Sequence, residues 1–381
     1  MLQLTELPPL SLYIHTPWCI KKCPYCDFNS HTSEQLPEAA YLQSLKNDLD
    51  HDLSYVQSRP LRSIFIGGGT PSLLSPAFYR SLLDHIRNKV DWADDIEITM
   101  EANPGTVEQQ SFAGYREAGI NRLSLGIQSF DDEKLTALGR IHGGAEAQAA
   151  ITIARQSGFD NFNLDLMHGL PGQTEQQALQ DLDIALSFNP PHLSWYQLTI
   201  EPNTAFYSRP PTLPEDDDLW KIQEAGQARL KQHHLNQYEV SAYAKEGHQA
   251  KHNLNYWQFG DYLGIGAGAH GKVSVIDEQG AIINRYQKTR QPEAYLKRID
   301  HYRASSQNLA ADDLPLEFLM NAMRLNEGVS ESCYSSTTGL PISTLEPALS
   351  QARKDQLIEP ARLQATPKGH LFLNQLLDRF L

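Results

Sequence analysis

Residues 12–28 read LYIHTPWCIKKCPYCDF and hold three of the chain's four cysteines. Cys19, Cys23 and Cys26 form the pattern C-x3-C-x2-C directly after residues 12–15, an apolar run typical of a strand. We therefore expect the cysteines in the loop at the carboxyl end of the first strand. Disulfides among them would close only very small loops, so ligation of a metal or a cluster explains the pattern better.

Three thiolates in one loop suit an iron–sulfur cluster in which one iron is left without a protein ligand. The alternatives are a zinc site completed by His15 or His31, and a set of buried thiols. Zinc sites of this kind usually contain a second ligand pair much further along the chain, which favours the cluster here. The remaining cysteine, Cys333, is isolated in the sequence, and we expect it to be a buried, inert thiol.

Apolar, β-branched runs alternate with helical patterns through the first 200 residues. Thr106 followed by Gln109, and Thr174 followed by Gln177, fit capping boxes at helix starts, and Gly119 and Gly158 are typical of helix ends. Such alternation predicts a mainly parallel sheet, open or curled into a barrel, with ligands at the carboxyl ends of the strands. Six strands are expected, at residues 12–15, 61–66, 96–100, 122–127, 162–167 and 193–198.

The alternation stops near residue 245, which predicts two domains, 1–245 and 246–381. From residue 314 onward the pattern is one of short helices, and residues 361–372 are expected to form a small, winged-helix-like end. Gly266 and the residues up to Gly271 match G-x-G-x-x-G, but a strand-like run follows instead of a helix. The context of a dinucleotide site is therefore missing, and nicotinamide binding is not expected.

The composition is that of a globular protein, with 40% hydrophobic and 20% charged residues. Its formal net charge of −14 disfavours binding to nucleic acid or to anionic lipid surfaces. The first residues, MLQLTELPPL, lack the basic and apolar regions of a signal peptide, and no apolar run approaches the ~18 residues of a membrane span. We expect a cytoplasmic protein without a membrane anchor.

Further polar or flexible residues follow the later strands. Gly67-Gly68-Gly69-Thr70-Pro71 follows the second strand, where backbone without side chains can approach a ligand closely, although a plain turn would also explain it. Glu101, Gln128 and Asp165 lie at or near the ends of the next three strands, which converge in a barrel. Each alone could be an ordinary solvated polar residue.

The motif from Tyr13 to Phe28 resembles the opening of the radical S-adenosylmethionine (SAM) enzymes and, more narrowly, of the oxygen-independent coproporphyrinogen III oxidase group. The resemblance implies a partial (β/α)6 TIM-like barrel with a smaller, mainly helical C-terminal domain. It also implies that Cys19, Cys23 and Cys26 hold a [4Fe–4S] cluster whose fourth iron is chelated by SAM. The SAM-binding residues implied are Tyr13 beside the cluster and Gly69, Thr70, Glu101, Gln128, Arg140 and Asp165.

Two departures from the oxidases indicate the branch of this group. Phe28 stands where the oxidases have a further cysteine, and only a dozen residues precede the first strand. His252-Asn-Leu-Asn-Tyr256-Trp257 matches the H-N-x-x-Y-W motif of a branch whose members act as heme chaperones. The resemblance implies heme contact by this segment, since imidazole is a standard heme ligand and Tyr256 and Trp257 offer flat apolar surface.

The sequence thus favours a heme chaperone on a radical SAM scaffold, with heme as cargo and apo-hemoproteins, respiratory enzymes among them, as recipients. The alternative is an oxygen-independent coproporphyrinogen III oxidase, which decarboxylates its substrate oxidatively through a 5′-deoxyadenosyl radical. A third option is a SAM pocket retained only as architecture. Whether the chain is an enzyme, and whether it is a monomer or a dimer, is left open.

Overall fold

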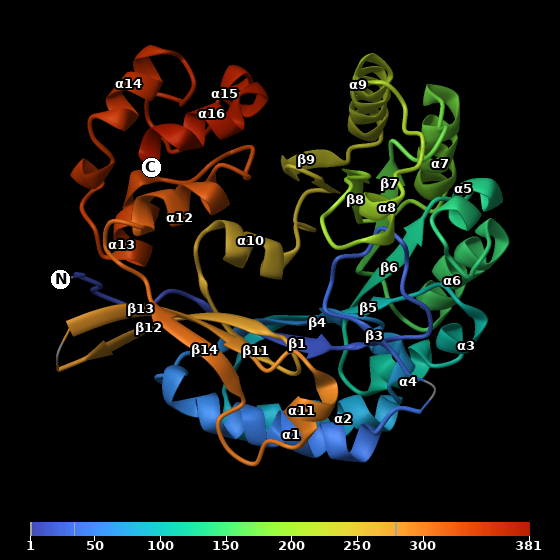
Figure 1. The fold of residues 1–381 in the computed structure, drawn as a ribbon, viewed down its shortest axis with the longest axis horizontal. Coiled ribbons are helices and arrows are strands. Elements are labelled where there is room, and N and C mark those ends of the chain that lie inside the picture. Colours follow the sequence, from blue (N-terminus) through green and yellow to red (C-terminus); the bar gives the residue numbers. More distant parts are fainter. Residues whose placement is uncertain (1, 34, 279) are drawn as a thin grey trace.

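The computed structural model describes residues 2–33, 35–278 and 280–381. Its main sheet has twelve strands in the order β14-β13-β12-β11-β1-β4-β5-β6-β7-β8-β10-β9 (Figure 1). In chain order these are β1 (Leu10–Thr16), β4 (Leu61–Gly68), β5 (Trp92–Ala102), β6 (Arg122–Gln128), β7 (Phe162–His168), β8 (His192–Gln197), β9 (Asn236–Glu239), β10 (Ala242–Ala244), β11 (Asp261–Ile265), β12 (His270–Asp277), β13 (Gly280–Lys288) and β14 (Arg303–Asn308). A separate pair joins β2 (Trp18–Cys19) to β3 (His31–Thr32).

The six strands β1, β4, β5, β6, β7 and β8 are neighbours, and every pair among them is parallel. All six predicted strands are confirmed, because each apolar run is buried in the sheet. The crossovers between them carry helices on the outer face, as in a partial (β/α)6 barrel, and α10 lies on the opposite, concave face (Figure 1).

The helices vary greatly in length. In the barrel region they are α1 (Glu38–Asp52), α2 (Pro76–Lys89), α3 (Thr106–Gln109), α4 (Phe112–Glu117), α5 (Asp132–Ala137), α6 (Gly144–Gln156), α7 (Glu175–Ser187), α8 (Ala205–Ser208) and α9 (Asp216–Gln232). Then follow α10 (Lys251–Trp257), α11 (Pro292–Leu296), α12 (Leu314–Ala322), α13 (Glu331–Thr338), α14 (Ala348–Lys354), α15 (Pro367–Leu371) and α16 (Leu373–Leu377). Most of the predicted boundary signals are confirmed, since Thr174 caps α7 with Gln177 in a capping box, and Gly119 and Gly158 have positive φ. The capping box expected at Thr106 and Gln109 is wrong, because Thr106 is the first residue of α3 and Gly105 is the N-cap.

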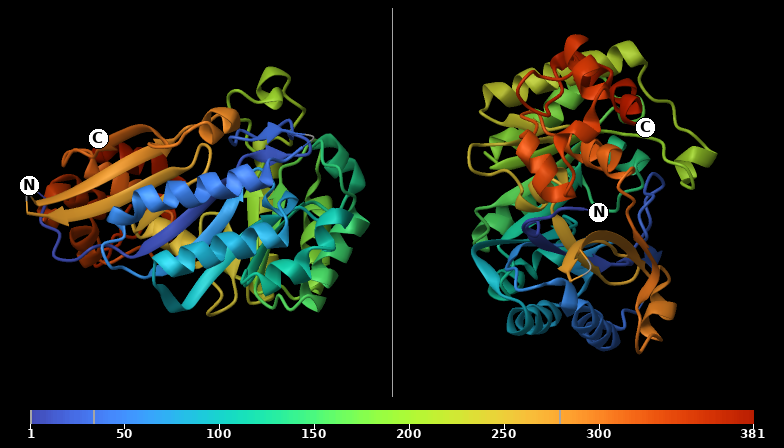
Figure 2. Two further views of the ribbon diagram at one scale, coloured as in Figure 1. Left: turned by 90° about the horizontal axis from the view of Figure 1, so that it is seen from below. Right: turned by 90° about the vertical axis from the view of Figure 1, so that its left-hand side faces the viewer.

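The sheet continues beyond residue 245. Strand β11 pairs with β1 in parallel, and β12, β13 and β14 add antiparallel strands at that edge. The helices from α12 onward have their own apolar cluster, which includes Phe318 and Tyr334, and Leu4 near the N-terminus packs into it. Both chain termini lie at this end of the molecule (Figure 2). The division at residue 245 stays a prediction, and the strands after it belong to the sheet of the barrel.

The C-terminal region also contains short strand-like contacts. Isolated antiparallel bridges join Val329 to Leu363 and Ile358 to Ala365. The second bridge joins residues on either side of 359–362, and the first attaches this segment to the chain just before α13. The winged-helix-like end remains a prediction, and this arrangement of bridges and short helices is compatible with it.

A buried charge cluster ties helix α1 to the edge strands. The Asp48 carboxylate accepts hydrogen bonds from Lys288 on β13, from the Tyr295 hydroxyl at 2.6 Å and from the Gly266 backbone N–H at 3.0 Å. Lys288 also pairs with Asp52 at 2.7 Å. Because these groups are almost fully buried, each charge depends on its partner for stabilisation.

We predict that Asp48→Ala lowers the free energy of unfolding by about 3 kcal/mol or more, because it leaves the buried Lys288 ammonium short of a partner. Asp50→Ala is the matched control, since Asp50 lies on the same helix, is 39% exposed and pairs with His85 and Lys89 at the surface. The control should cost at most about 1 kcal/mol. Urea unfolding measures both, and equal losses would contradict this role for Asp48.

Candidate functional site

The three clustered cysteines lie just beyond the carboxyl end of β1. Cys19 belongs to β2, which is held in place by its pairing with His31 and Thr32 of β3. Cys23 and Cys26 follow in the next turn, where the Cys26 N–H donates to the Cys23 carbonyl at 3.2 Å. All three are free thiols and partly buried, as the sequence predicts for a ligand loop.

The glycine run packs directly against this cysteine loop. The Gly69 N–H donates to the Thr16 carbonyl at 2.6 Å, and the Thr70 N–H donates to the Trp18 carbonyl at 2.7 Å. A Cβ on Gly69 would overlap the Trp18 carbonyl oxygen. A plain turn therefore does not fully explain the glycine run, because Gly69 is required for the close approach of two loops at the strand ends.

A cavity of about 310 Å³ opens between the two loops. Its lining includes the three cysteines together with Gly69, Thr70, Glu101, Gln128, Arg140 and Asp165. The structure thus brings together every residue expected around the cluster and SAM except Tyr13, which lies in a neighbouring cavity. Lys22, Ser30, Asn103 and Tyr196 also line the cavity and were not anticipated.

Arg140 points its guanidinium towards the cysteines. Its Nη1 lies 3.7 Å from Cys23 Sγ, and its Nη2 donates to the Asn103 Oδ1 at 2.7 Å and to the Gly126 carbonyl at 2.9 Å. The buried Nε has no hydrogen-bond partner, and within the described residues no carboxylate pairs with Arg140. A fixed cation with a free donor beside the thiols fits the carboxylate of a bound amino acid.

Acidic and amide residues from β5, β6 and β7 also line the cavity. Asp165 accepts hydrogen bonds from Ser124 Oγ and Asn163 Nδ2, both at 2.8 Å. The Tyr196 hydroxyl donates to Gln128 Oε1 at 2.8 Å. Burial raises the pKa of Asp165, and burial together with the Asp165 charge raises the pKa of Glu101 to about 7. These oxygen acceptors suit the hydroxyl groups of a ribose.

The raised pKa of Glu101 predicts a pH-dependent stability of the ligand-free protein. The folded state retains a proton that the unfolded chain releases above pH ~4.3, so its contribution is full at low pH and is lost as the pH rises through about 7. The unfolding free energy of the wild type minus that of Glu101→Gln should therefore fall between pH 5 and pH 8. Urea titrations across this range test it, and a constant difference would contradict the assignment.

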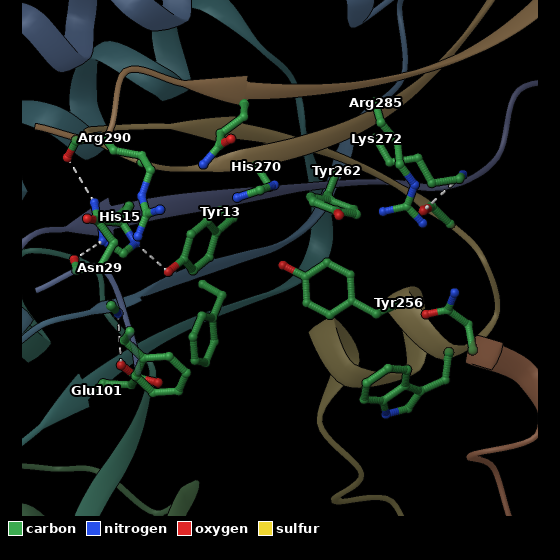
Figure 3. Close-up of a pocket in the computed structure, with 18 of the residues that line it drawn as sticks. Tyr13, His15, Asn29, Glu101, Tyr256, Tyr262, His270, Lys272, Arg285 and Arg290 are labelled. Carbon is green, nitrogen blue, oxygen red and sulfur yellow. Dashed lines mark hydrogen bonds between the residues drawn. The ribbon is translucent and has the colours of Figure 1, made fainter. Parts of the chain in front are cut away.

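A larger cavity of about 740 Å³ adjoins the first one and shares Phe28, Gly68 and Glu101 with it. One wall is aromatic and includes Tyr256 and Trp257 of α10 (Figure 3). The opposite wall comes from the β12–β13 hairpin, and the remaining lining includes Tyr13, His15, Phe65, Tyr262, His270, Lys272, Arg285 and Arg290.

The H-N-x-x-Y-W segment contributes unequally to this larger cavity. Tyr256 and Trp257 line it, as expected, whereas His252 does not. The His252 ring is buried against Phe65, with its Nδ1 3.5 Å from Glu97 Oε1. Burial lowers the pKa of His252, and the Glu97 hydrogen bond opposes that shift. Within the segment, Tyr256 and Trp257 reach the cavity, whereas the first turn of α10 with His252 points into the barrel; heme contact by the segment stays a prediction.

The place of Tyr13 beside the cluster stays a prediction. It lines the larger cavity, stacks on Phe65, and its hydroxyl is 2.8 Å from His15 Nδ1. Since β1 alternates its side chains, Tyr13 lies on the concave face of the sheet, three residues before Thr16, at which the strand ends.

The basic residues of the larger cavity were missed by the sequence analysis. Lys272 Nζ is committed to Asp261 Oδ1 at 3.0 Å, and Arg285 pairs with Glu317. Arg290 is exposed, and no described carboxylate pairs with it. Burial of the ring and the charges of Arg285 and Arg290 lower the pKa of His270, which favours a neutral imidazole. The alternation of side chains along β12 and β13 was the sequence signal from which these basic residues could have been found.

Other expectations concern metals, membranes and Cys333. Among the described residues, no three His, Cys, Asp or Glu side chains stand close enough to hold a single metal ion. A cubane does not need that geometry, since each cysteine binds a different iron.

Within the same residues, no helix is both long and apolar enough to span a membrane. Cys333 is partly buried, and burial raises the pKa of its thiol to about 11.

The fold and the cysteine loop define a radical SAM protein. The model of the radical SAM superfamily matches residues 13–185, and the model of the HemN C-terminal domain matches residues 309–372. The solved coproporphyrinogen III oxidase HemN from Escherichia coli, described as a radical SAM enzyme, covers 98% of this chain and 90% of its own with a TM-score of 0.81. At 24% identity, this likeness establishes the fold alone.

Curated relatives are similar over the whole length. The heme chaperone HemW of Escherichia coli (strain K12) is 54% identical over 381 residues, 99% of this chain and 100% of that protein. That of Haemophilus influenzae is 52% identical over 99% of each chain, and that of Bacillus subtilis 32% over 97% of this chain and 99% of its own. The chain therefore belongs to the HemW family within the radical SAM superfamily.

Proposed function

We propose that this protein is a heme chaperone, which binds heme in the 740 Å³ cavity and passes it to apo-hemoproteins. The observation that carries the proposal is the pairing of an aromatic wall with a basic wall in a cavity beside the cysteine loop. Relatives that share the whole length of the chain bear the name heme chaperone. The volume of this cavity lies within the ~300–1,000 Å³ typical of ligand sites.

Heme combines a flat apolar ring with two carboxylates at one edge, and the cavity offers surfaces for both. Tyr256, Trp257 and Phe65 present aromatic faces and edges on which a porphyrin can pack. The exposed Arg290 guanidinium has no carboxylate partner among the described residues and suits a propionate. The cavity is open to solvent through Arg290, which suits a cargo that has to be released.

The smaller cavity would hold the resident cofactors of the family, a [4Fe–4S] cluster on Cys19, Cys23 and Cys26 and SAM beside it. A bound cluster supplies electrons next to the sulfonium of SAM. Arg140 would hold the SAM carboxylate, Gly69 and Thr70 would contact its amino group, and Gln128 and Asp165 would accept from its ribose. Whether this chain cleaves SAM is a separate question from heme binding.

The SAM assignment predicts a large effect of Arg140→Ala. Losing a charge-assisted pair should weaken SAM binding about 10- to 100-fold, while the iron and sulfide content stays that of the wild type. Arg80→Ala is the control, because Arg80 is 55% exposed and lies outside both cavities. Anaerobic calorimetry of the reconstituted protein provides the affinities. Unchanged SAM affinity in Arg140→Ala would contradict this assignment.

The heme proposal is tested by titrating the protein with hemin and following the Soret band. Tyr256→Ala should weaken hemin binding about 10-fold or more, because it removes an aromatic contact of the cavity. Tyr207→Ala is the matched control, since Tyr207 is 59% exposed and lies outside both cavities. The hemin-loaded protein should then transfer heme to a heme-free hemoprotein. Absence of hemin binding by the wild type would refute the proposal.

An assay for the decarboxylation of coproporphyrinogen III distinguishes the oxidase alternative from a chaperone. Reduced, reconstituted protein incubated with SAM and coproporphyrinogen III should give no decarboxylated product if the chain is a chaperone. Phe28 is 61% exposed at the junction of the two cavities, where it can supply neither a thiol nor a proton. Formation of protoporphyrinogen would favour the oxidase.

A further inference from the structure

We propose that His270 provides the axial ligand to the heme iron. The inference rests on the proposed function, because it places the iron of that cargo in the larger cavity. His270 is the first residue of β12, it lines the cavity, and it faces the space in front of Tyr13 and Tyr262 (Figure 3). Within the described part of the chain, no residue forms a hydrogen bond with its ring. A ring nitrogen is thus available to a ligand.

The other histidine of the cavity is already occupied. His15 is 4% exposed, its Nδ1 is 2.8 Å from the Tyr13 hydroxyl, and its Nε2 is 2.8 Å from the Asn29 carbonyl. Both ring nitrogens therefore have partners, and neither is free to bind iron. His15 instead holds the base of the cavity and orients Tyr13.

His252, which the family motif suggests, is also poorly placed as a ligand. It lies outside the lining of the cavity, its ring centroid is 4.1 Å from that of Phe65, and its Nδ1 faces Glu97. His252 is 8% exposed and packs on Phe65, so its ring does not face the space of the cavity. We assign His252 a positioning role, in which its packing against Phe65 fixes the helix that carries Tyr256 and Trp257.

The backbone around His270 is built to present its side chain. Gly266 and Gly268 have positive φ, and the Ala269 N–H closes the turn on the Gly266 carbonyl at 3.0 Å. A Cβ on Gly264 would overlap the His270 carbonyl, and one on Gly271 would overlap the Tyr286 ring. The G-x-G-x-x-G pattern thus serves a tight turn between β11 and β12 that delivers a histidine to the cavity wall.

Neighbouring residues orient a ligand bound to His270. Gln287 pairs with His270 across the hairpin, and Lys272 pairs with Arg285, so these four side chains share one face of it. Tyr256 lies across the cavity from this face (Figure 3), and Trp257 of the same helix also lines the cavity. A porphyrin between the walls would receive the imidazole on one side and aromatic packing on the other. Arg290, beyond the end of β13, would receive a propionate.

The test compares His270→Ala with His252→Gln and with His248→Ala, an exposed histidine outside the cavity. We expect His270→Ala to lose the iron–histidine band in the resonance Raman spectrum of the ferrous complex and to bind hemin about 10-fold more weakly or worse. Added imidazole should restore a histidine-like spectrum in His270→Gly. The two control variants should keep the band, and circular dichroism should show that all variants are folded.

Two results would overturn the assignment. The band could persist in His270→Ala, or it could be lost in His252→Gln with His270 intact. Both leave the proposed function standing, because the wild type still binds heme. Failure of wild-type protein to bind hemin at all would instead remove the proposed function and this inference with it.

Discussion

The whole site depends on the docking of two loops through their backbones. The hydrogen bonds from Gly69 and Thr70 to the carbonyls of Thr16 and Trp18 attach the cysteine loop to the end of the parallel sheet. Only a residue without a Cβ allows this approach at Gly69. Because the two loops approach this closely, the thiols that follow β1 in the chain line one cavity together with side chains from β5, β6 and β7.

A second consequence is that the two cavities are neighbours. Phe28 and Glu101 belong to both linings, so the cavities that we propose for cargo and for cofactors are separated by side chains and not by a layer of secondary structure. The raised pKa of Glu101 reflects this position at the junction, where burial and Asp165 act on it together. A ligand in either cavity would alter the surroundings of the same carboxyl group, and this couples the two sites in our proposal.

The fold and the smaller cavity were largely predictable from sequence, because parallel strands bring their carboxyl ends to one edge whatever the details of packing. That rule was enough to join Glu101, Gln128 and Asp165 to the cysteine loop. That rule does not place His252 or Tyr13, since neither the rotation of α10 nor the face that β1 turns inward is set by a motif. His270 and Arg290 were missed because pairing of β11 with β1, some 250 residues apart in the chain, brings their hairpin to the cavity.

The adjacency of cluster and cargo is the central claim, and a spin-relaxation measurement tests it most directly. The reduced [4Fe–4S] cluster would be examined by electron paramagnetic resonance, with cobalt(II) protoporphyrin or the diamagnetic zinc protoporphyrin bound in place of heme. We predict that the cobalt porphyrin makes the cluster signal markedly harder to saturate with microwave power than the zinc porphyrin does. Identical saturation with both porphyrins bound would contradict neighbouring sites.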